Sequence, residues 1–270
     1  MKKIFFVLPI LFFLLCLISL LKKKPAGDFS FLSGPAVNAS QIDKKYIVRT
    51  FSWKNLKKEA LKTTLKIPVK ELKKEIKKFG IVKGMLNPRY LKKQGFKRLG
   101  EEYVVDYREV YRRNKAHFMG ITNDLAAAAK IGKNRNPLVD FLCFTQQIEY
   151  QIPPKILNGR YIREFYTPLQ CLEKKKGDCD TKSVLLAEFL GAIDESPESL
   201  AVLILKGHGI FHAILAIKRK PLPGTLKLFF QGKGYFMPLE TSGPGWMPGF
   251  VGRNTFNCLK AGRFRFEPLN

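Results

Sequence analysis

A single cysteine carries the clearest chemical signal in this chain. Cys179 stands in Gly177-Asp178-Cys179-Asp180, where a charged stretch gives way to the apolar, periodic run 184–190, so we expect the thiol in the first turn of a helix. The unpaired N–H groups and the positive dipole end of that helix favour an anion, and therefore a thiolate nucleophile. Because Asp178 and Asp180 oppose this effect, a second residue has to supply most of the activation.

Two later residues are candidates for completing a nucleophilic site. His212 opens an alternating run of apolar residues that ends at Ile217, and Glu240 closes a second run that begins at Tyr235. A histidine can accept the proton of a thiol, and a carboxylate can orient the imidazole and compensate its positive charge. His208, four residues before His212, is a rival base if the strand begins earlier.

Strand alternation decides whether these groups can meet. It places His212 with Ile214 and Ala216 on one face of a strand. It also places Glu240 with Phe236 on one face of a later strand. The three groups come together if both of these faces look toward the Cys179 helix.

Each residue also has an ordinary structural interpretation. A free cysteine is usually a small buried hydrophobe. A histidine at the start of a strand is usually a satisfied structural residue, and a glutamate at a strand end is usually solvated. A cysteine in the core, however, is rarely flanked by glycine and two carboxylates. A histidine and a carboxylate also follow Cys179 in order, which favours the catalytic interpretation of Cys179, His212 and Glu240.

Motifs of metal and nucleotide sites are missing from the sequence. It contains no Cys-x-x-Cys and no His-Glu-x-x-His, and it has 3 histidines in all, which disfavours zinc. It also contains no Gly-x-Gly-x-x-Gly and no phosphate-binding loop. We therefore predict neither a metal nor a cofactor.

The order of the expected elements predicts an α+β fold. Alternation indicates strands at 47–53 and 62–69, and helical spacing indicates helices at 69–79, 118–131 and 137–150. After a loop at 155–176, the Cys179 helix runs to about residue 191 or 194. Four strands complete the chain, at 200–205, 212–218, 225–231 and 235–240, and a tight turn at Gly232-Lys233-Gly234 joins the last two. Helices followed by an antiparallel meander are typical of α+β proteins.

The first residues read as a membrane segment. Residues 4–21 are apolar apart from Pro9 and Ser19, and lysines flank them on both sides, so the run is just long enough to cross a bilayer. No Ala-x-Ala pattern follows Leu21, which favours a retained anchor over a cleaved signal. Lipidation at Cys16 is the minor alternative. Flanking charges determine the orientation poorly, and we favour the bulk of the chain outside the cytoplasm.

We divide the chain into four parts. These are a signal or transmembrane anchor at 1–24, a linker rich in Gly, Ser, Pro and Ala at 25–45, a small basic α+β lead-in at 46–115, and a catalytic core at 116–270. With 270 residues and 46% apolar composition, the chain is long enough to bury a substantial core.

The charge is strongly positive and unevenly distributed. The net charge is +26, and residues 22–115 hold 26 Lys and Arg against 9 Asp and Glu. Such a surface suits anionic lipid or a wall polymer, although a lysine-rich solvated surface explains the charge equally well. Nucleic-acid binding is a weaker interpretation, because few aromatic residues are interleaved with the basic ones.

The remaining cysteines do not predict a disulfide framework. If Cys179 is a reduced nucleophile, then Cys143, Cys171 and Cys258 cannot pair off completely. Three thiols are the expected state, and one bridge among them is the alternative in an oxidising compartment.

Three segments of the sequence resemble the transglutaminase-like superfamily. Gly177-Asp178-Cys179 before a helix, a strand-initial His212, and the segment from Tyr235 to Thr241 are similar to its motifs. The stretches 144–150 and 240–246 resemble a bacterial and archaeal branch, and the resemblance spans roughly residues 47 to 266. It implies a permuted papain-like core, with a nucleophile helix packed on an antiparallel sheet.

The resemblance also implies roles for individual residues. Cys179 would be the nucleophile, His212 the general base and Glu240 the carboxylate that many relatives supply as aspartate. Gln146 would donate to the oxyanion together with the backbone N–H of Cys179, with Gln147 as the alternative after a small shift. Asp180-Thr181 departs from the acidic pair common in the branch.

The superfamily leaves the reaction open. It contains crosslinking enzymes, peptidases, amidases and inactive scaffolds, and the active members share acyl transfer through a thioester. Because no acceptor site is legible, we take water as the acceptor and expect a peptidase or amidase acting on a peptide or protein. A protein-glutamine transglutaminase with an amine acceptor, or a non-catalytic binding scaffold, is the alternative.

Overall fold

The computed structural model describes most of the chain after residue 41. The described residues are 42–43, 45–79, 96–99, 102–131, 137–154, 156–157, 160–161, 165–193, 196–207, 210–220 and 223–270. The predicted anchor, most of the predicted linker and His208 lie outside them. Among the described residues, no helix combines the length and the apolar character that crossing a bilayer requires.

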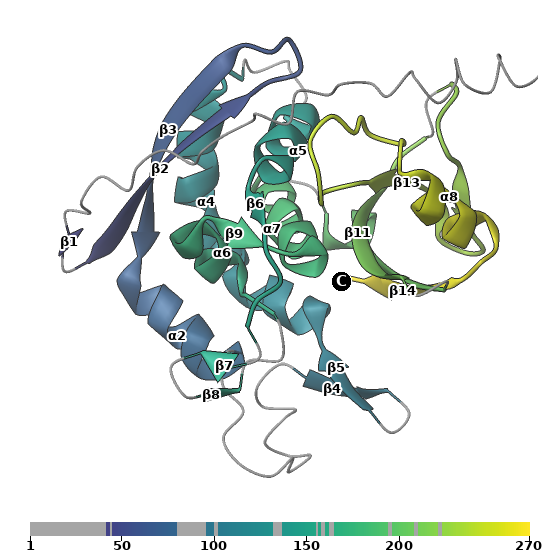
Figure 1. Cartoon of the computed structure of the whole chain (residues 1–270), viewed down its shortest axis with the longest axis horizontal. Coiled ribbons are helices and arrows are strands. Elements are labelled where there is room, and N and C mark those ends of the chain that lie inside the picture. The colour runs from purple at the N-terminus through teal and green to yellow at the C-terminus, as the bar shows by residue number, and fades with distance from the viewer. Residues whose placement is uncertain are drawn as a thin grey trace, which may run out of the picture. The chain divides into compact units, whose positions relative to one another are not determined.

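Helices and mainly antiparallel strands form the secondary structure of the described residues (Figure 1), in line with the α+β prediction, and only the short pair of β6 and β9 among them is parallel. The helices are α2 (Val69–Phe79), α4 (Tyr107–Ala128), α5 (Leu138–Gln146), α6 (Pro168–Lys174), α7 (Cys179–Ala192), α8 (Arg253–Lys260) and the 3-10 turn η1 (Pro197–Ser199). The strands are β1 (Ile42–Asp43), β2 (Tyr46–Lys54), β3 (Ala60–Pro68), β4 (Phe96–Leu99), β5 (Glu102–Val105), β6 (Glu149–Tyr150), β7 (Ile156–Leu157), β8 (Arg160–Tyr161), β9 (Lys176–Gly177), β10 (Leu200–Gly207), β11 (Ile210–Lys218), β12 (Leu228–Phe230), β13 (Gly234–Leu239) and β14 (Phe264–Pro268).

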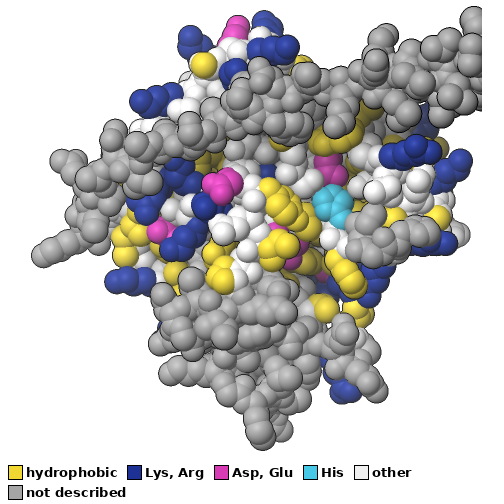
Figure 2. All heavy atoms as spheres, in the orientation of Figure 1, with side chains coloured by type: hydrophobic (Ala, Val, Ile, Leu, Met, Phe, Trp, Pro, Cys, Tyr) yellow, Lys and Arg dark blue, Asp and Glu magenta, His cyan; other side chains and the backbone are white. Residues whose placement is uncertain are grey.

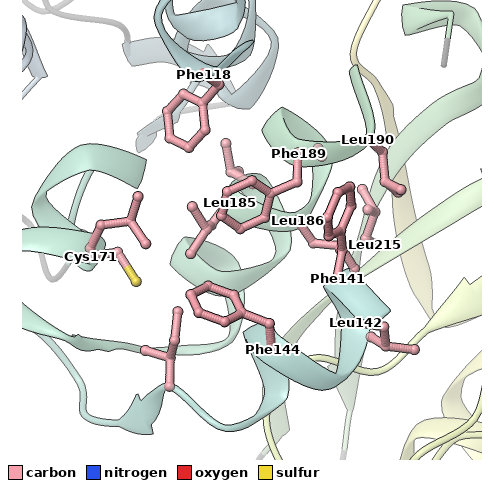
Figure 3. Close-up of a cluster of buried hydrophobic side chains, with 14 of the residues drawn as sticks. Phe118, Phe141, Leu142, Phe144, Cys171, Leu185, Leu186, Phe189, Leu190 and Leu215 are labelled. Atoms are coloured by element: carbon pink, nitrogen blue, oxygen red, sulfur yellow. The ribbon is translucent and has the colours of Figure 1, made fainter. Parts of the chain in front are cut away.

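Helix α7 is the centre of the main hydrophobic core. It contacts α4, α5 and α6, and it also packs against β11. Aromatic rings from three helices converge there (Figure 3): the Phe189 centroid lies 5.6 Å from that of Phe118, 5.6 Å from that of Phe141 and 5.7 Å from that of Phe144. The helix that begins with the candidate nucleophile is therefore held on all sides by packing.

The hairpin of β2 and β3 packs on the same core. Its strands pair over nine residues each, and alternate side chains point inward. The rings of Phe51 and Trp53 lie 5.2 Å and 5.3 Å from the ring of Phe144 on α5. The predicted lead-in, residues 46–115, thus shares its core with the predicted catalytic part, and α4 continues across the predicted boundary at residue 115.

A five-stranded antiparallel sheet covers the other side of α7. Its order is β12-β13-β11-β10-β14. One face carries Ala213, Leu215 and Leu239 into the core around α7, and the opposite face carries Ile214 and Phe236 into a second cluster under α8. The faces of Ile214 and Phe236 therefore do not look toward the Cys179 helix, so the condition set for the meeting of the three groups is not met through these faces, because residues of α8 and β14 supply a second core there.

Three helices differ from the prediction. Helix α4 begins at Tyr107 instead of residue 118, because Asp106 caps it by accepting a hydrogen bond from the Glu109 N–H. Helix α6 lies inside the predicted loop and has a capping box, in which Thr167 and Gln170 each bond the backbone of the other. Helix α8 follows the last predicted strand.

The cysteines behave as the sequence predicts. Cys143, Cys171, Cys179 and Cys258 are free thiols. Cys171 and Cys258 are buried, and Cys143 is half-buried. None of the four takes part in a disulfide.

Candidate active site

The candidate nucleophile is the first residue of α7. Cys179 follows the N-cap residue Asp178, whose carboxylate accepts a hydrogen bond from the Thr181 N–H at 3.3 Å. Gly177 approaches its neighbours closely, since a Cβ atom there would lie 2.8 Å from Thr181 and 2.9 Å from the Cys171 sulfur. A side chain at this position would clash with Thr181 and Cys171, so the packing at the helix start requires glycine just before Asp178 and Cys179.

His212 and Glu240 form a direct pair. His212 Nε2 lies 2.9 Å from Glu240 Oε2, and the other carboxylate oxygen accepts from Ser242 N–H at 3.0 Å and from Ser242 Oγ at 2.6 Å. Burial by itself would raise the pKa of Glu240, but the hydrogen bonds from His212 and Ser242 hold it below its ordinary value. The carboxylate therefore stays ionised beside the imidazole.

Hydrogen bonds tie this pair to the start of α7. The backbone N–H of Ala213, next to His212, donates to the Cys179 sulfur. Ser183 Oγ donates to Cys179 O at 2.7 Å, and Thr241 Oγ1 lies 3.2 Å from Ser183 Oγ. The structure thus brings Cys179, His212 and Glu240 into one region.

His212 reaches the site although Ile214, which shares its strand face, lies in the second cluster. The pairing of β11 with β13 begins only at Leu215, and Glu240 lies just beyond the end of β13. His212 still pairs with Leu205 of β10, so the two side chains meet at the point where β11 and β13 part. Glu240 occupies Nε2, so Nδ1 is the ring nitrogen left for a thiol proton, although among the described contacts none joins the imidazole to the thiol.

The thiol itself is not pre-activated. Burial, followed by the charges of Asp180 and Asp178, raises the pKa of Cys179 to about 12. The Ala213 N–H and the Tyr150 hydroxyl act in the opposite direction. The predicted lowering of this pKa is therefore wrong for the state described here, because burial and two carboxylates outweigh the helix N-terminus.

Asp180, the residue after the nucleophile, is bonded to a buried tyrosine. Its Oδ2 accepts a hydrogen bond from the buried Tyr107 hydroxyl at 2.9 Å. Burial and the neighbouring Asp178 raise the pKa of Asp180 well above its ordinary value. This carboxyl group is therefore a poor source of activation for Cys179.

Gln146 is bonded through both ends of its side-chain amide. Its amide nitrogen donates to Glu240 O at 2.9 Å and to Trp246 O at 2.8 Å, and its amide oxygen accepts from Gly245 N–H at 3.1 Å. The side chain is thus engaged in holding the loop after Glu240. An oxyanion role stays a prediction that requires one of these bonds to open.

The alternative, Gln147, is engaged elsewhere. Its amide bonds the backbone N–H and carbonyl of Lys54 at 2.8 Å and 2.7 Å, and it donates to Cys143 O at 3.0 Å. These contacts fasten the end of β2 to the end of α5.

Sequence analysis missed two residues of the site, Lys182 and Tyr150. Lys182 is fully buried, and its ammonium donates to Gln146 O at 3.0 Å and to Ile148 O at 2.9 Å. The Tyr150 hydroxyl donates to the Cys179 sulfur. The sequence signal for Lys182 was a charged residue within an otherwise mostly apolar helix, whereas Tyr150 had no comparable signal.

Aromatic side chains are exposed close to the site. Phe211, next to His212, is 84% exposed, and Trp246, whose carbonyl bonds Gln146, is 37% exposed. Figure 2 shows a histidine ring at the surface between acidic and apolar side chains. The partial exposure of Trp246 allows both packing against the core and contact with a substrate.

Comparisons with known proteins give little beyond this geometry. No family model matches the chain, and no curated protein matches it. Two solved structures of Legionella pneumophila LapG, one of them EGTA-treated, are similar at a TM-score of 0.34 and 13% identity, covering 60% of this chain and 79% and 77% of theirs. At that level of similarity, function has to be inferred from the site itself.

Proposed function

We propose that this protein is a cysteine-dependent acyl-transfer enzyme with a transglutaminase-like, papain-like core. It cleaves a peptide or protein substrate as a peptidase or amidase, through a thioester on Cys179. The observation that carries the proposal is the His212–Glu240 pair, 2.9 Å apart, tied to the helix that begins with a free cysteine. Nucleophile, base and orienting carboxylate are the three parts that this chemistry needs.

The reaction divides into two balanced steps. His212 Nδ1 takes the proton of Cys179, the sulfur bonds to the substrate carbonyl carbon, and the C–N bond breaks as the leaving amine takes that proton. In the second step His212 takes a proton from water, the hydroxide bonds to the thioester carbon, and the sulfur leaves with its electron pair and recovers the proton. The carboxylate of Glu240 compensates the charge of the imidazolium in both steps.

One observation favours a second candidate, a binding scaffold without turnover. The pKa of Cys179 is raised to about 12, whereas an active thiol nucleophile needs a larger thiolate fraction at neutral pH. If the protein is an enzyme, His212 has to take the proton of the Cys179 thiol while substrate is bound. If the protein is a binding scaffold, no such proton transfer is needed.

An assay on the full chain separates the candidates. Wild type, Cys179→Ala and the control Cys143→Ala, which removes a half-buried thiol elsewhere, are incubated with a mixed peptide library and a primary amine. We expect hydrolysed peptides from wild type and Cys143→Ala, and none from Cys179→Ala. Amine adducts in excess of hydrolysis would assign an amine acceptor, and a folded wild type with no product and no acylated Cys179 would support the scaffold.

Tethering to a membrane is part of the same proposal. Residues 4–21 would retain the chain in a bilayer, with its bulk outside the cytoplasm and its basic front half against anionic lipid or a wall polymer. Full-length protein should then pellet with membranes and resist both carbonate and high salt. Release by salt alone would assign the attachment to the basic surface instead.

A further inference from the structure

We propose that Tyr150 is a catalytic hydrogen-bond donor of this site. Its hydroxyl donates to the Cys179 sulfur in the resting protein and to the substrate carbonyl oxygen during acyl transfer. This is the side-chain role that the sequence assigns to Gln146. The inference rests on the proposed function and names a group that acts in it.

Backbone pairing places Tyr150 beside the nucleophile. The short strands β6 and β9 run parallel, and Tyr150 pairs with Gly177, two residues before Cys179. The next residue extends the pairing, since the Gln151 N–H donates to Gly177 O at 3.2 Å. The tyrosine is thereby fixed to the same strand that leads into α7.

The buried ammonium of Lys182 holds this segment from the other side. It donates to Gln146 O and Ile148 O, so it spans the turn between the end of α5 and Tyr150. Lys182 and Cys179 belong to the same helix. The nucleophile and the tyrosine are therefore positioned by one rigid element, which is what pre-organised stabilisation of a transition state requires.

The tyrosine hydroxyl is suited to donate. Burial, followed by the charge of Cys179, raises the pKa of Tyr150, so the hydroxyl keeps its proton at neutral pH. The residue is still 47% exposed, so a substrate arriving at the sulfur can meet its ring. Gln146, in contrast, is 3% exposed and already donates twice.

The chemical step requires no proton from Tyr150. As the sulfur bonds to the carbonyl carbon, the electron pair of the C=O bond moves onto the oxygen, which becomes an oxyanion. That oxygen is attached to the carbon bonded to the sulfur, so a donor that reaches the sulfur can also reach the oxygen. The Tyr150 O–H and the backbone N–H of Cys179 donate to it, and both bonds relax when the leaving group departs.

Two small reagents test the proposal without knowledge of the substrate. p-Nitrophenyl acetate acylates a thiolate through an oxyanion, whereas iodoacetamide alkylates it by displacing iodide and forms none. Both rates depend on the same thiolate fraction, so their ratio at one pH cancels it. The two rates at Cys179 are measured for full-length wild type and Tyr150→Phe, with Tyr235→Phe, a tyrosine of equal exposure on another hairpin, as the control.

We expect Tyr150→Phe to lower the alkylation rate about tenfold, because the thiolate loses one donor. Acylation should fall much further, so that the ratio of the two rates drops by about a hundredfold, the usual loss of one oxyanion donor. Tyr235→Phe should leave both rates unchanged. Circular dichroism and a melting curve verify that each variant is folded.

Three results would overturn the proposal. An unchanged ratio would mean that Tyr150 bonds the resting thiol but not the oxyanion. Faster reactions in Tyr150→Phe would mean that the tyrosine shields the thiol from reagents. If wild-type Cys179 were alkylated but never acylated, the proposed function would fail and the catalytic role would fail with it. This third result is measured on the wild-type protein, whereas the first two need the Tyr150→Phe variant, so the failure of the proposed function can be told apart from the failure of the catalytic role.

Discussion

The two halves of the candidate site are built in opposite ways. In the base half, Glu240 is buried but receives hydrogen bonds from His212 and Ser242, and its pKa is lowered. In the thiol half, Cys179 is buried beside Asp178 and Asp180, and its pKa is raised to about 12. The base half is complete in the resting protein, and the thiol half is not.

The difference shows what decides the charge of a buried group. Glu240 and Asp180 are both removed from water, yet their pKa values move in opposite directions. Both carboxylates accept hydrogen bonds, but the first lies beside the imidazole of His212, whereas the second has another carboxylate, Asp178, as its neighbour. Helix position alone did not lower the pKa of Cys179, so its activation has to come from groups that contact the sulfur directly.

The largest expected effect lies in the base half. Glu240→Gln removes the negative charge that compensates the imidazolium of His212, and we expect acyl transfer to fall by up to about ten-thousandfold, as in other triads. The measurement is turnover with the peptide identified in the library assay. Glu149→Gln, on an exposed carboxylate, is the control and should keep normal turnover. Near-normal turnover in Glu240→Gln would mean that another group orients His212.

Lys182 joins the two halves, and its removal should reduce stability. Lys182→Met leaves the carbonyls of Gln146 and Ile148 without their buried donor, which should lower the free energy of unfolding by about 2 kcal/mol at pH 7. Chemical denaturation measures this. Lys176→Met, which removes a surface ion pair, should change stability by less than about 1 kcal/mol.

The cost of Lys182→Met should also depend on pH. Burial lowers the pKa of Lys182 to about 8, from 10.5 in the unfolded chain. Between pH 8 and 10.5 the unfolded state binds more protons than the folded state, so Lys182 adds to the free energy of unfolding as the pH rises. The neutral amine of Lys182 keeps two hydrogens, enough to donate to both carbonyls. The gap between wild type and variant should therefore widen by about 3 kcal/mol from pH 7.5 to 10.5. A gap that narrows would show that the charge of the ammonium, and not its hydrogens, holds the segment.

Much of the fold was predictable because it follows from local patterns. The hairpin of β2 and β3, the start of α7 at Cys179 and four strands of the main sheet lie close to their predicted positions. The strand faces were not predictable, because alternation says which residues share a face and not which face meets α7. That choice depends on α8, which packs on the other face, and on the β14 side chains Phe264 and Phe266, which add to the cluster there.

The site was predictable in its residue types and less so in its contacts. The order of Cys179, His212 and Glu240 suggested that they meet, and the structure brings them into one region. The engagement of Gln146 depends on hydrogen bonds to residues 94 to 100 positions away, which no local pattern encodes. The same holds for Tyr150, whose position follows from pairing with a strand of two residues.

A smaller effect is expected in the thiol half. Asp180→Asn removes one of the two carboxylates beside the sulfur, while the amide oxygen can still accept from Tyr107. The pKa of Cys179 should fall by about one unit, so that alkylation by iodoacetamide at pH 8 becomes about tenfold faster. Asp124→Asn, on the exposed face of α4, should have no effect. An unchanged rate in Asp180→Asn would show that burial and Asp178 keep the thiol protonated without a contribution from Asp180.

Ser242→Ala should have the smallest effect on activity. It tests whether the His212–Glu240 pair depends on the hydroxyl of Ser242. The substitution removes the 2.6 Å bond to Glu240 Oε1 but leaves the backbone N–H of the same residue at 3.0 Å. Ser242 is half-buried, so water can replace the hydroxyl, and we expect kcat/KM to fall only about fivefold. Ser52→Ala, on the exposed side of β2, serves as the control. A loss approaching that of Glu240→Gln would mean that Ser242 determines which carboxylate oxygen faces His212, and that the base half depends on a single hydroxyl.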